Sequence, residues 1–539
     1  MVAWAWHYGR TEPDLGCMAL GHPTPAHTGG LHIHSHSHRL IRILAVALTA
    51  ASLAIPAAQR STLAAEPLAG SPPNIVFILV DDLGAIDDRV LDRLPEIKDT
   101  FVDHGTRFSD FYGETALCCP GRAGFLTGLH THHHNVIRND ARLLDPSMTV
   151  ATQLHSVGYR TILVGKYLNK YDLVAPAEPP GWDTFQALVP GDTSYAGYYE
   201  YDLWIDGAAT PKHFGTSPQA YSTDVIANRT LNALRAAPLG QPIFAWVAPF
   251  AVHGPTIPAP RHRSDPRCSS IPLWAPASYN ETDVSDKPAY VQAEPLSNEA
   301  GFSLGRTCRT MLAIDDMVGD IKAELAASGR LDDTMFILTS DNGMNLGAHR
   351  LPAKSAPYAT QIPFFVSWPR VLHRGPRRVE EMLSNIDVAP TLCEFAGCTM
   401  GPYPGGQPSP DGISFARILL EDVQTLGRDA ILQSSPAKNV KLSMPSWFGL
   451  RTTPQSVYAS TRCAAAETGG CLWHYARYSD KARELYDDSN GPCWLWNDGQ
   501  TGDPCELDNL MLDPAYAELA GLLDARLDAL LLEPDVTSP

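Results

Sequence analysis

The sequence predicts an α/β fold built on a large, mixed, mostly parallel β-sheet that is flanked by helices. Short apolar, β-branched runs alternate with stretches of helical periodicity, which is the pattern of parallel strands joined by crossover helices. Ionisable or polar residues follow four of these runs. Late in the chain the strands become shorter and cysteines occur in nearby pairs, which predicts a smaller C-terminal α+β domain.

The four apolar runs are the expected central strands of the sheet. They are 74–80 before Asp81 and Asp82, 161–164 before Gly165 and Lys166, 243–249 shortly before His253, and 335–340 before Asp341 and Asn342. In open α/β sheets ligands bind at the edge where the carboxyl ends of the strands meet. One such residue pair is often only a helix cap. Four of them together predict one site assembled from distant segments.

We expect three parts in the chain. They are a leader with an export signal (1–65), the α/β domain (66–425) and a smaller domain (426–539) that packs the amphipathic stretch 515–532. In the leader, Arg39 and Arg42 precede the apolar run 43–55. This run is short and rich in alanine, so it predicts secretion or export to the periplasm, with an N-terminal membrane anchor as the alternative.

The charge of the chain excludes some classes of partner. Its 539 residues carry a net charge of −18. A surface this acidic argues against nucleic acid, and against an anionic membrane as a stable partner. A small anionic substrate stays open, because its site needs only local positive charge.

Eight cysteines are expected to form disulfides. The chain has eleven cysteines, of which Cys17 lies in the leader and Cys118 and Cys119 are adjacent to each other. An even number of remaining cysteines after an export signal indicates disulfide bonds. Proximity favours the pairs Cys393–Cys398, Cys463–Cys471 and Cys493–Cys505, which leaves Cys268–Cys308.

The residues at the predicted sheet edge favour a hard metal ion. Asp81, Asp82, Asp341 and Asn342 offer only oxygen ligands. Such ligands suit Ca²⁺, with Mg²⁺ as the alternative, whereas Zn²⁺ prefers histidine and cysteine.

Basic residues accompany these acidic ones. They are Arg122, Lys166, His253 and Lys354. Together with a metal ion they could surround a small tetrahedral oxyanion ester and neutralise its charge. Each of them by itself is more often a solvated surface residue, but their places after strands and next to glycine or proline favour a functional site.

Several segments of the sequence resemble those of a known family. Residues 118–122 (CCPGR) followed by 126–128 (LTG) are similar to the type I sulfatase signature C-x-P-S-R-x-x-x-L-T-G. The strand ending in Asp-Asp, the Gly-Lys pair after a strand and the later SDNG with a downstream lysine also match, and the resemblance spans roughly 72–510. It implies an alkaline-phosphatase-like fold and a sulfuric ester hydrolase.

The resemblance also implies roles for single residues. A formylglycine-generating enzyme, the expected maturation partner, would oxidise Cys118 to Cα-formylglycine, whose hydrate attacks sulfur and then expels sulfate. Cys118 in this form would join Asp81, Asp82, Asp341 and Asn342 as a ligand of Ca²⁺. Arg122 would hold the formylglycine, Lys166 and Lys354 would bind sulfate, and His253 would protonate the leaving oxygen.

Two positions depart from the family pattern. Gly121 replaces the usual serine of the signature, and Leu168 occupies the place of a second histidine that many sulfatases have. Removal of a proton during sulfate release would then need another group. The histidine-rich run 130–135 is a candidate, with a surface loop as the alternative reading.

The segments 165–171 (GKYLNKY) and 340–352 (SDNGMNLGAHRLP) resemble the N-acetylglucosamine-6-sulfatase and heparan endosulfatase group. This resemblance implies removal of 6-O-sulfate from N-acetylglucosamine or a related glycosaminoglycan sugar. The alternatives are an arylsulfatase acting on aryl sulfates, a phosphonate or phosphate ester hydrolase of the same superfamily, and a secreted protein that only binds sulfated glycans.

Overall fold

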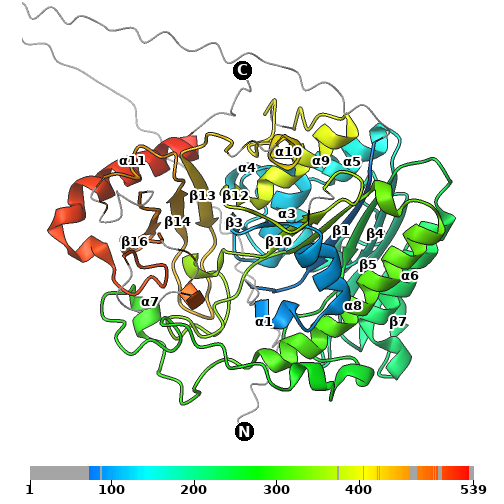
Figure 1. The fold of residues 1–539 in the computed structure, drawn as a ribbon, viewed down its shortest axis with the longest axis horizontal. Coiled ribbons are helices and arrows are strands. Elements are labelled where there is room, and N and C mark those ends of the chain that lie inside the picture. The colour runs from blue at the N-terminus through cyan, green and yellow to red at the C-terminus, as the bar shows by residue number, and fades with distance from the viewer. Residues whose placement is uncertain are drawn as a thin grey trace, which may run out of the picture. The chain divides into compact units, whose positions relative to one another are not determined.

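In the described part of the chain, ten strands form the main sheet, in the order β11-β2-β10-β9-β1-β8-β4-β5-β6-β7. Figure 1 labels β10, β1, β4, β5 and β7 of this sheet. The structure is a computed structural model. It describes residues 72–532 except 85–87, 373–374, 405, 422, 424, 462, 464–469, 490, 492 and 496–500. The predicted leader and its export signal, 1–65, therefore lie outside the described residues.

The centre of this sheet is parallel, antiparallel strands lie on either side of the centre, and the edge strand β11 pairs parallel with β2. Its strands are β1 (Asn74–Val80), β2 (Thr106–Phe108), β4 (Arg160–Gly165), β5 (Thr184–Pro190), β6 (Tyr201–Ile205), β7 (Lys212–Phe214), β8 (Ile243–Ala248), β9 (Thr334–Ser340), β10 (Phe364–Ser367) and β11 (Arg377–Val379). Strands β9, β1, β8, β4 and β5 are parallel neighbours, whereas β10 pairs antiparallel with both β9 and β2, and β6 with both β5 and β7. A separate parallel pair joins β3 (Phe111–Tyr112) to β12 (Leu383–Ser384).

The four predicted central strands are confirmed, as β1, β4, β8 and β9. They are adjacent in the sheet, in the order β9-β1-β8-β4, so their carboxyl ends share one edge. The predicted fold class is confirmed as well.

Helices cover both faces of the main sheet because its central strands are apolar on both sides. In β1, Phe77 belongs to one buried core and its neighbour Ile78 to the other. The first core includes residues of α3, α5 and α9, and the second includes residues of α6 and α8. The helices are α1 (Asp88–Leu91), α2 (Pro95–Ile97), α3 (Cys118–Thr127), α4 (Thr131–His134), α5 (Val150–Ser156), α6 (Ser222–Ala236), α7 (Ala289–Gln292), α8 (Leu304–Ala327), α9 (Val388–Ala396), α10 (Ala416–Leu420) and α11 (Ala517–Leu532).

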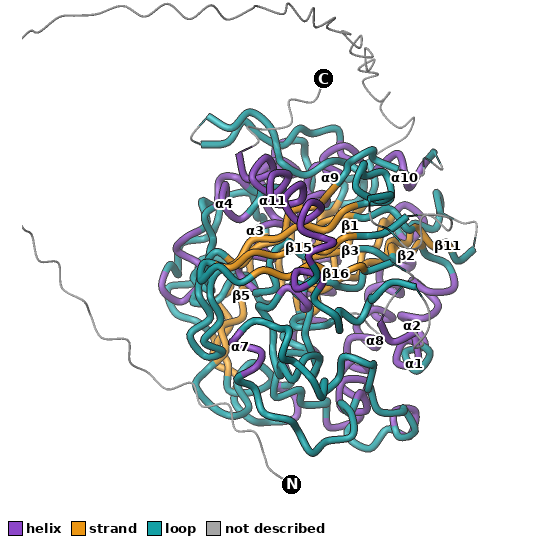
Figure 2. Tube along the Cα trace, turned by 90° about the vertical axis from the view of Figure 1, so that its left-hand side faces the viewer, coloured by secondary structure: helices purple, strands orange, loops and turns teal. Residues whose placement is uncertain are grey.

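A second, antiparallel sheet follows in the C-terminal part of the chain. It consists of β13 (Ala430–Ser435), β14 (Trp447–Thr452), β15 (Trp473–Tyr478) and β16 (Arg483–Asp487). The predicted amphipathic stretch forms α11, which lies along this sheet (Figure 2) and buries Leu519, Leu523 and Leu527 in a core with Trp473 and Tyr475. The order of elements agrees with a smaller C-terminal domain, whose boundary at 425/426 stays a prediction.

All four predicted disulfides are present, at Cys268–Cys308, Cys393–Cys398, Cys463–Cys471 and Cys493–Cys505. Cys118 and Cys119 are free and buried. Among the described residues, no helix combines the length and the apolar character that crossing a membrane requires.

Candidate active site

The polar residues predicted at the sheet edge do meet there. Asp81 follows β1, Lys166 follows β4, His253 lies five residues after the end of β8, and Asp341 follows β9. Backbone hydrogen bonds hold these strand ends together: Asp81 N donates to Ala251 O over 3.1 Å, and Asp341 N donates to Val80 O over 3.1 Å. The parallel register of the sheet therefore determines the positions of the backbone atoms that carry these side chains.

Helix α3 places Cys118 at the same edge. Cys118 is its first residue, and Leu117 before it is extended. Pro120 sits in the first turn, where its missing N–H costs no helical hydrogen bond. Gly128 ends the helix in the left-handed conformation that favours glycine, with φ of 70°. All residues of α3 are buried, so its position against the sheet is set by close packing.

The Cys118 side chain is surrounded by charged groups. Its Sγ lies 2.9 Å from Lys354 Nζ, 3.8 Å from Asp81 Oδ1 and 3.9 Å from Asp82 Oδ1. Burial raises the pKa of the Cys118 thiol to about 12, against the opposing effect of Lys166 and Lys354. The unmodified residue is therefore a neutral thiol at pH 7, and a neutral thiol is a poor nucleophile.

Two buried basic residues contact Asp81. Lys166 Nζ donates to Asp81 Oδ2 over 2.6 Å, and Arg122 Nη2 lies 3.8 Å from the same oxygen. Burial alone would raise the pKa of Asp81, but Lys166, His253 and Arg122 together hold it well below its usual value. Burial alone would lower the pKa of Lys166, and Asp81 raises it above its usual value. Asp81 is therefore a carboxylate and Lys166 an ammonium ion at neutral pH.

Arg122 connects Asp81 to the second acidic segment. Its Nε donates to Asp341 Oδ2 over 2.8 Å, and its Nη1 donates to the carbonyl oxygen of Lys166 over 2.5 Å. The other oxygen of Asp341 accepts the backbone N–H of Asp82 over 3.0 Å. Arg122 Nη2 is buried and has no hydrogen-bond partner among the described residues, so one donor of the guanidinium stays available.

Asp82, Asn342 and Lys354 form the third part of the site. Lys354 Nζ donates to Asp82 Oδ1, and it lies 3.3 Å from Asn342 Oδ1. Asn342 Nδ2 donates to Asp82 Oδ1 over 2.9 Å. Asp82 also faces His253, whose Nε2 lies 3.4 Å from Asp82 Oδ2. His253 Nδ1 donates to Gly254 O over 2.8 Å, which leaves Nε2 facing the site.

These residues form a possible metal-binding site. Ligand atoms of Asp81, Asp82, Cys118 and His253 lie within 4.8 Å of one another. Two carboxylates of the predicted oxygen ligands thus meet a thiol and an imidazole here, whereas the predicted ligands Asp341 and Asn342 are not part of this group. The Lys354 ammonium is held by a carboxylate oxygen, an amide oxygen and Sγ, so the donors around it already form a cation-binding arrangement. The three carboxylates Asp81, Asp82 and Asp341 are matched by Arg122, Lys166 and Lys354, so a divalent ion would make the site positive enough to hold an anionic ester.

The structure gives a steric reason for glycine at position 121, which the sequence alone does not show. A Cβ at this position would lie 2.1 Å from the carbonyl oxygen of Asp341, which belongs to the backbone and cannot move aside. The backbone oxygen of Gly121 accepts a hydrogen bond of 2.9 Å from Asn385 Nδ2. Glycine therefore lets α3 approach the segment that follows β9.

The histidine-rich run forms a cluster of its own. His133 Nδ1 lies 2.8 Å from Asp411 Oδ2, His130 Nδ1 lies 3.6 Å from Glu114 Oε2, and His134 Nδ1 accepts the backbone N–H of Val136. This run is partly buried and is not a freely solvated loop. Its contacts with Glu114 and Asp411 give no support to the predicted role in proton removal. Leu168, at the place of the missing histidine, is buried in the main core.

Cys119 and Asn345 are two further buried polar positions, which the sequence did not single out as functional. Cys119 Sγ accepts the backbone N–H of Asn169 over 3.1 Å, which ties α3 to the segment that carries Lys166. Asn345 is 3% exposed, and its backbone N–H donates to Ala353 O, directly before Lys354. Among the described residues its side-chain amide has no hydrogen-bond partner. Burial becomes visible only in the folded chain, so no local signal marked either residue.

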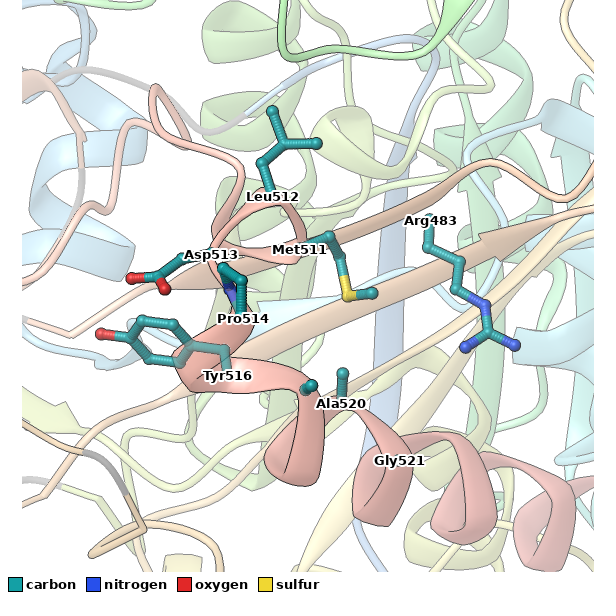
Figure 3. A pocket seen from close by; sticks show the side chains of 9 residues that line it. Arg483, Met511, Leu512, Asp513, Pro514, Tyr516, Ala520 and Gly521 are labelled. Carbon is teal, nitrogen blue, oxygen red and sulfur yellow. The ribbon is translucent and has the colours of Figure 1, made fainter.

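The surface also has a pocket of about 290 Å³ away from these residues (Figure 3). It lies between the start of β16 and the start of α11, and Arg483, Met511, Pro514 and Tyr516 line it. None of the predicted site residues lines this pocket, so it is separate from the candidate active site.

The fold and the site define a hydrolase of the alkaline-phosphatase-like class. The sulfatase family model matches residues 73–398. The chain therefore belongs to the sulfatase family, and it is a sulfuric ester hydrolase.

Individual relatives support this assignment. The N-acetylglucosamine-6-sulfatase of Capra hircus is 29% identical over 489 residues, which cover 84% of this chain and 82% of the relative. The solved structure of a protein in complex with its substrate D-glucosamine-2-N,6-O-disulfate has a TM-score of 0.63 at 21% identity, covering 87% of this chain and 100% of that chain. The phosphonate monoester hydrolase of Agrobacterium radiobacter has a TM-score of 0.60 at 21% identity, covering 85% and 95%. At these identities the two structures establish the shared fold.

The close packing at Gly121 predicts that serine, the usual residue of the family signature at this position, destabilises this protein. Gly121→Ser is expected to lower the free energy of unfolding by about 1–3 kcal/mol, because its Cβ would overlap the carbonyl oxygen of Asp341. Urea unfolding measures this. The control is Gly521→Ser in α11, where a Cβ meets nothing within 4 Å. Equal or greater stability of Gly121→Ser would contradict the close approach.

Proposed function

We propose that this enzyme removes the 6-O-sulfate from N-acetylglucosamine or a related glycosaminoglycan sugar. The observation that carries the proposal is the meeting of Cys118, Lys354 and the carboxylates Asp81 and Asp82 at one sheet edge. The sugar is suggested by relatives that are N-acetylglucosamine-6-sulfatases, at 28–29% identity over most of the chain. We further propose that the chain is secreted or periplasmic, and that a formylglycine-generating enzyme acts on it during maturation.

In the proposed mechanism, each of these residues has a separate role at the sulfate group. Cys118, converted to Cα-formylglycine, would supply a hydrate hydroxyl as the nucleophile. Lys166 and Lys354 would bind sulfate oxygens as ammonium ions. Arg122 would hold the nucleophile with its Nη2, which has no hydrogen-bond partner among the described residues. His253 would donate a proton from Nε2 to the leaving sugar oxygen, because its Nδ1 is already bonded to the backbone.

A divalent cation, Ca²⁺ with Mg²⁺ as the alternative, would add Lewis-acid stabilisation of the developing negative charge. Asp81, Asp82, Asp341, Asn342 and the modified Cys118 would hold it. Asp341 is positioned for this by Arg122 and the backbone of Asp82, which bond one carboxylate oxygen each.

An arylsulfatase or a phosphonate or phosphate ester hydrolase is the second candidate. Its supporting observation is the shared fold with the phosphonate monoester hydrolase. Relative rates on sulfate and phosphorus esters distinguish the two chemistries.

The first experiment combines mass spectrometry with a substrate screen. In active protein, the tryptic peptide across residue 118 is expected to carry formylglycine, and N-acetylglucosamine 6-sulfate is expected to be desulfated. Cys118→Ala should lower kcat by about a thousandfold or more, because it removes the nucleophile. An intact thiol in fully active protein would overturn the mechanism, and faster turnover of phosphonate esters than of sulfates would overturn the choice of substrate.

Removal of the metal gives the second test. Dialysis against a chelator should abolish turnover and lower the unfolding temperature, because the carboxylates lose the ion that they surround. Added Ca²⁺ or Mg²⁺ should restore both. Dialysis against chelator already saturated with Ca²⁺ is the control. Unchanged turnover in protein that elemental analysis finds free of divalent metal would disprove the metal role.

Asn345 provides a test of sugar recognition. Among the residues that the structure describes, its buried amide has no hydrogen-bond partner, and buried polar groups nearly always have one. We expect a substrate hydroxyl or amide to bind it, so Asn345→Ala should lower kcat/KM on N-acetylglucosamine 6-sulfate by about tenfold. Hydrolysis of 4-nitrophenyl sulfate, which has no sugar, should change by less than about twofold. Equal losses on both substrates would assign Asn345 a structural role instead.

A further inference from the structure

Residues 349–358, called here the Lys354 segment, are attached to the C-terminal sheet. The lysine side chain is long and flexible, so its ammonium reaches Cys118 reliably only if the backbone below it is held in place. Ser355, the next residue, has φ of 85°, in the left-handed region that a residue with a side chain rarely adopts. The surrounding contacts must therefore hold this turn in position.

Trp447, the first residue of β14, makes the contact nearest to Lys354. Its side chain is fully buried, and its Nε1–H donates to the carbonyl oxygen of Ser355 over 2.9 Å. Leu351 and Ala356, on either side of Lys354, belong to the same buried cluster as Trp447. One hydrogen bond and apolar packing thus hold the segment at the position of the lysine.

A second attachment lies four residues further along the chain. The hydroxyl of Tyr358 donates to Glu484 Oε1, and Glu484 in β16 is 1% exposed. The hydroxyl groups of Tyr478 and Tyr486 donate to the same carboxylate. Tyr358 is the member of this trio that comes from the Lys354 segment, whereas the other two belong to the C-terminal sheet.

The beginning of the segment is held from another direction. His349 Nδ1 lies 2.6 Å from Glu281 Oε2, and its ring lies 4.2 Å from the ring of Tyr358. The segment is thus fixed at both ends and in the middle.

We infer that Trp447 is a positioning residue for catalysis: by holding the carbonyl of Ser355, it places the Lys354 ammonium at the reacting atom of residue 118. Tyr358 supports the same placement through Glu484. The C-terminal sheet contributes in this way to the chemistry as well as to stability. The inference rests on the proposed role of Lys354.

The chain offers a matched control for a test. Trp473 in the neighbouring strand β15 is also buried, at 1% exposure, and its Nε1–H donates to a backbone carbonyl, that of Tyr458, over 2.8 Å. Trp447→Phe and Trp473→Phe each remove one indole donor from the same sheet. Each substitution leaves one backbone carbonyl without its indole donor. In Trp447→Phe this is the carbonyl of Ser355, in the Lys354 segment, and in Trp473→Phe it is that of Tyr458.

We expect Trp447→Phe to lower kcat by about tenfold with KM within about twofold, because a misplaced ammonium weakens stabilisation of the transition state more than substrate binding. Trp473→Phe should keep kcat within about twofold. Both kcat values are calculated per folded chain that contains formylglycine. Peptide mass spectrometry measures the fraction with formylglycine, and thermal unfolding shows that the variant is folded. Equal kcat values for the two variants, or a loss confined to KM, would overturn the inference.

A second pair covers the case in which Trp447→Phe does not fold. Tyr358→Phe and Tyr486→Phe each remove one hydroxyl donor to Glu484, and we expect a larger loss of kcat for Tyr358→Phe. Equal losses would overturn the placement through Glu484. In a Lys354→Ala background, Trp447→Phe should cost less than about twofold, because the ammonium that Trp447 is inferred to position is already absent. A full repeated loss would contradict the coupling.

Lys354→Ala separates this inference from the proposed function. Unchanged turnover by Lys354→Ala would refute the role of Lys354 and with it part of the proposed mechanism. A strongly impaired Lys354→Ala variant together with equal activities of the two tryptophan variants would refute the positioning role alone.

Discussion

The structure depends on a set of buried charges that meet at the carboxyl ends of the central strands. Asp81, Asp82 and Asp341 are matched by Arg122, Lys166 and Lys354, and most of these side chains have almost no contact with solvent. Removing such charges from water costs several kcal/mol each, which only a correctly placed partner offsets. The network therefore contributes little net stability, but it disfavours any arrangement in which strands β1, β4 and β9 are out of register.

This constraint explains why the rest of the site is so closely packed. Arg122 reaches Asp341 only because α3 lies directly against the segment after β9, and Gly121 permits that approach. Cys119 and Asn385 hold the same helix from other sides, through the backbone of Asn169 and of Gly121. Cys119 and Gly121, which lie between Cys118 and Arg122 in the signature, thus help to place these two side chains.

The network also extends beyond the main sheet. Lys354 is the most exposed of the three basic residues, at 14% of its side-chain area, and it comes from a segment without regular strand or helix at that point. Its position is determined by contacts with β14 and β16. In a sulfatase built this way, the smaller sheet helps to complete the site, and loss of these contacts would leave the Lys354 ammonium without a fixed position.

The sequence by itself determined the elements whose signal is local. The apolar runs that became β1, β4, β8 and β9, the polar residues behind them and the amphipathic stretch of α11 could all be read from composition and period. Proximity along the chain paired six of the eight disulfide cysteines and left Cys268 and Cys308 for each other, and the CCPGR motif was enough to indicate Cys118 and Arg122. These features depend on near neighbours, which a sequence displays directly.

Only the tertiary structure decided the contacts between residues far apart in the chain. The overlap between a side chain at position 121 and the carbonyl of Asp341, the bond from Trp447 to Ser355 and the burial of Asn345 have no local pattern. The same holds for the contacts of the histidine-rich run with Glu114 and Asp411, and the role of this run in proton removal stays a prediction. Such contacts arise from how the sheets and α3 pack, and packing is a property of the whole fold.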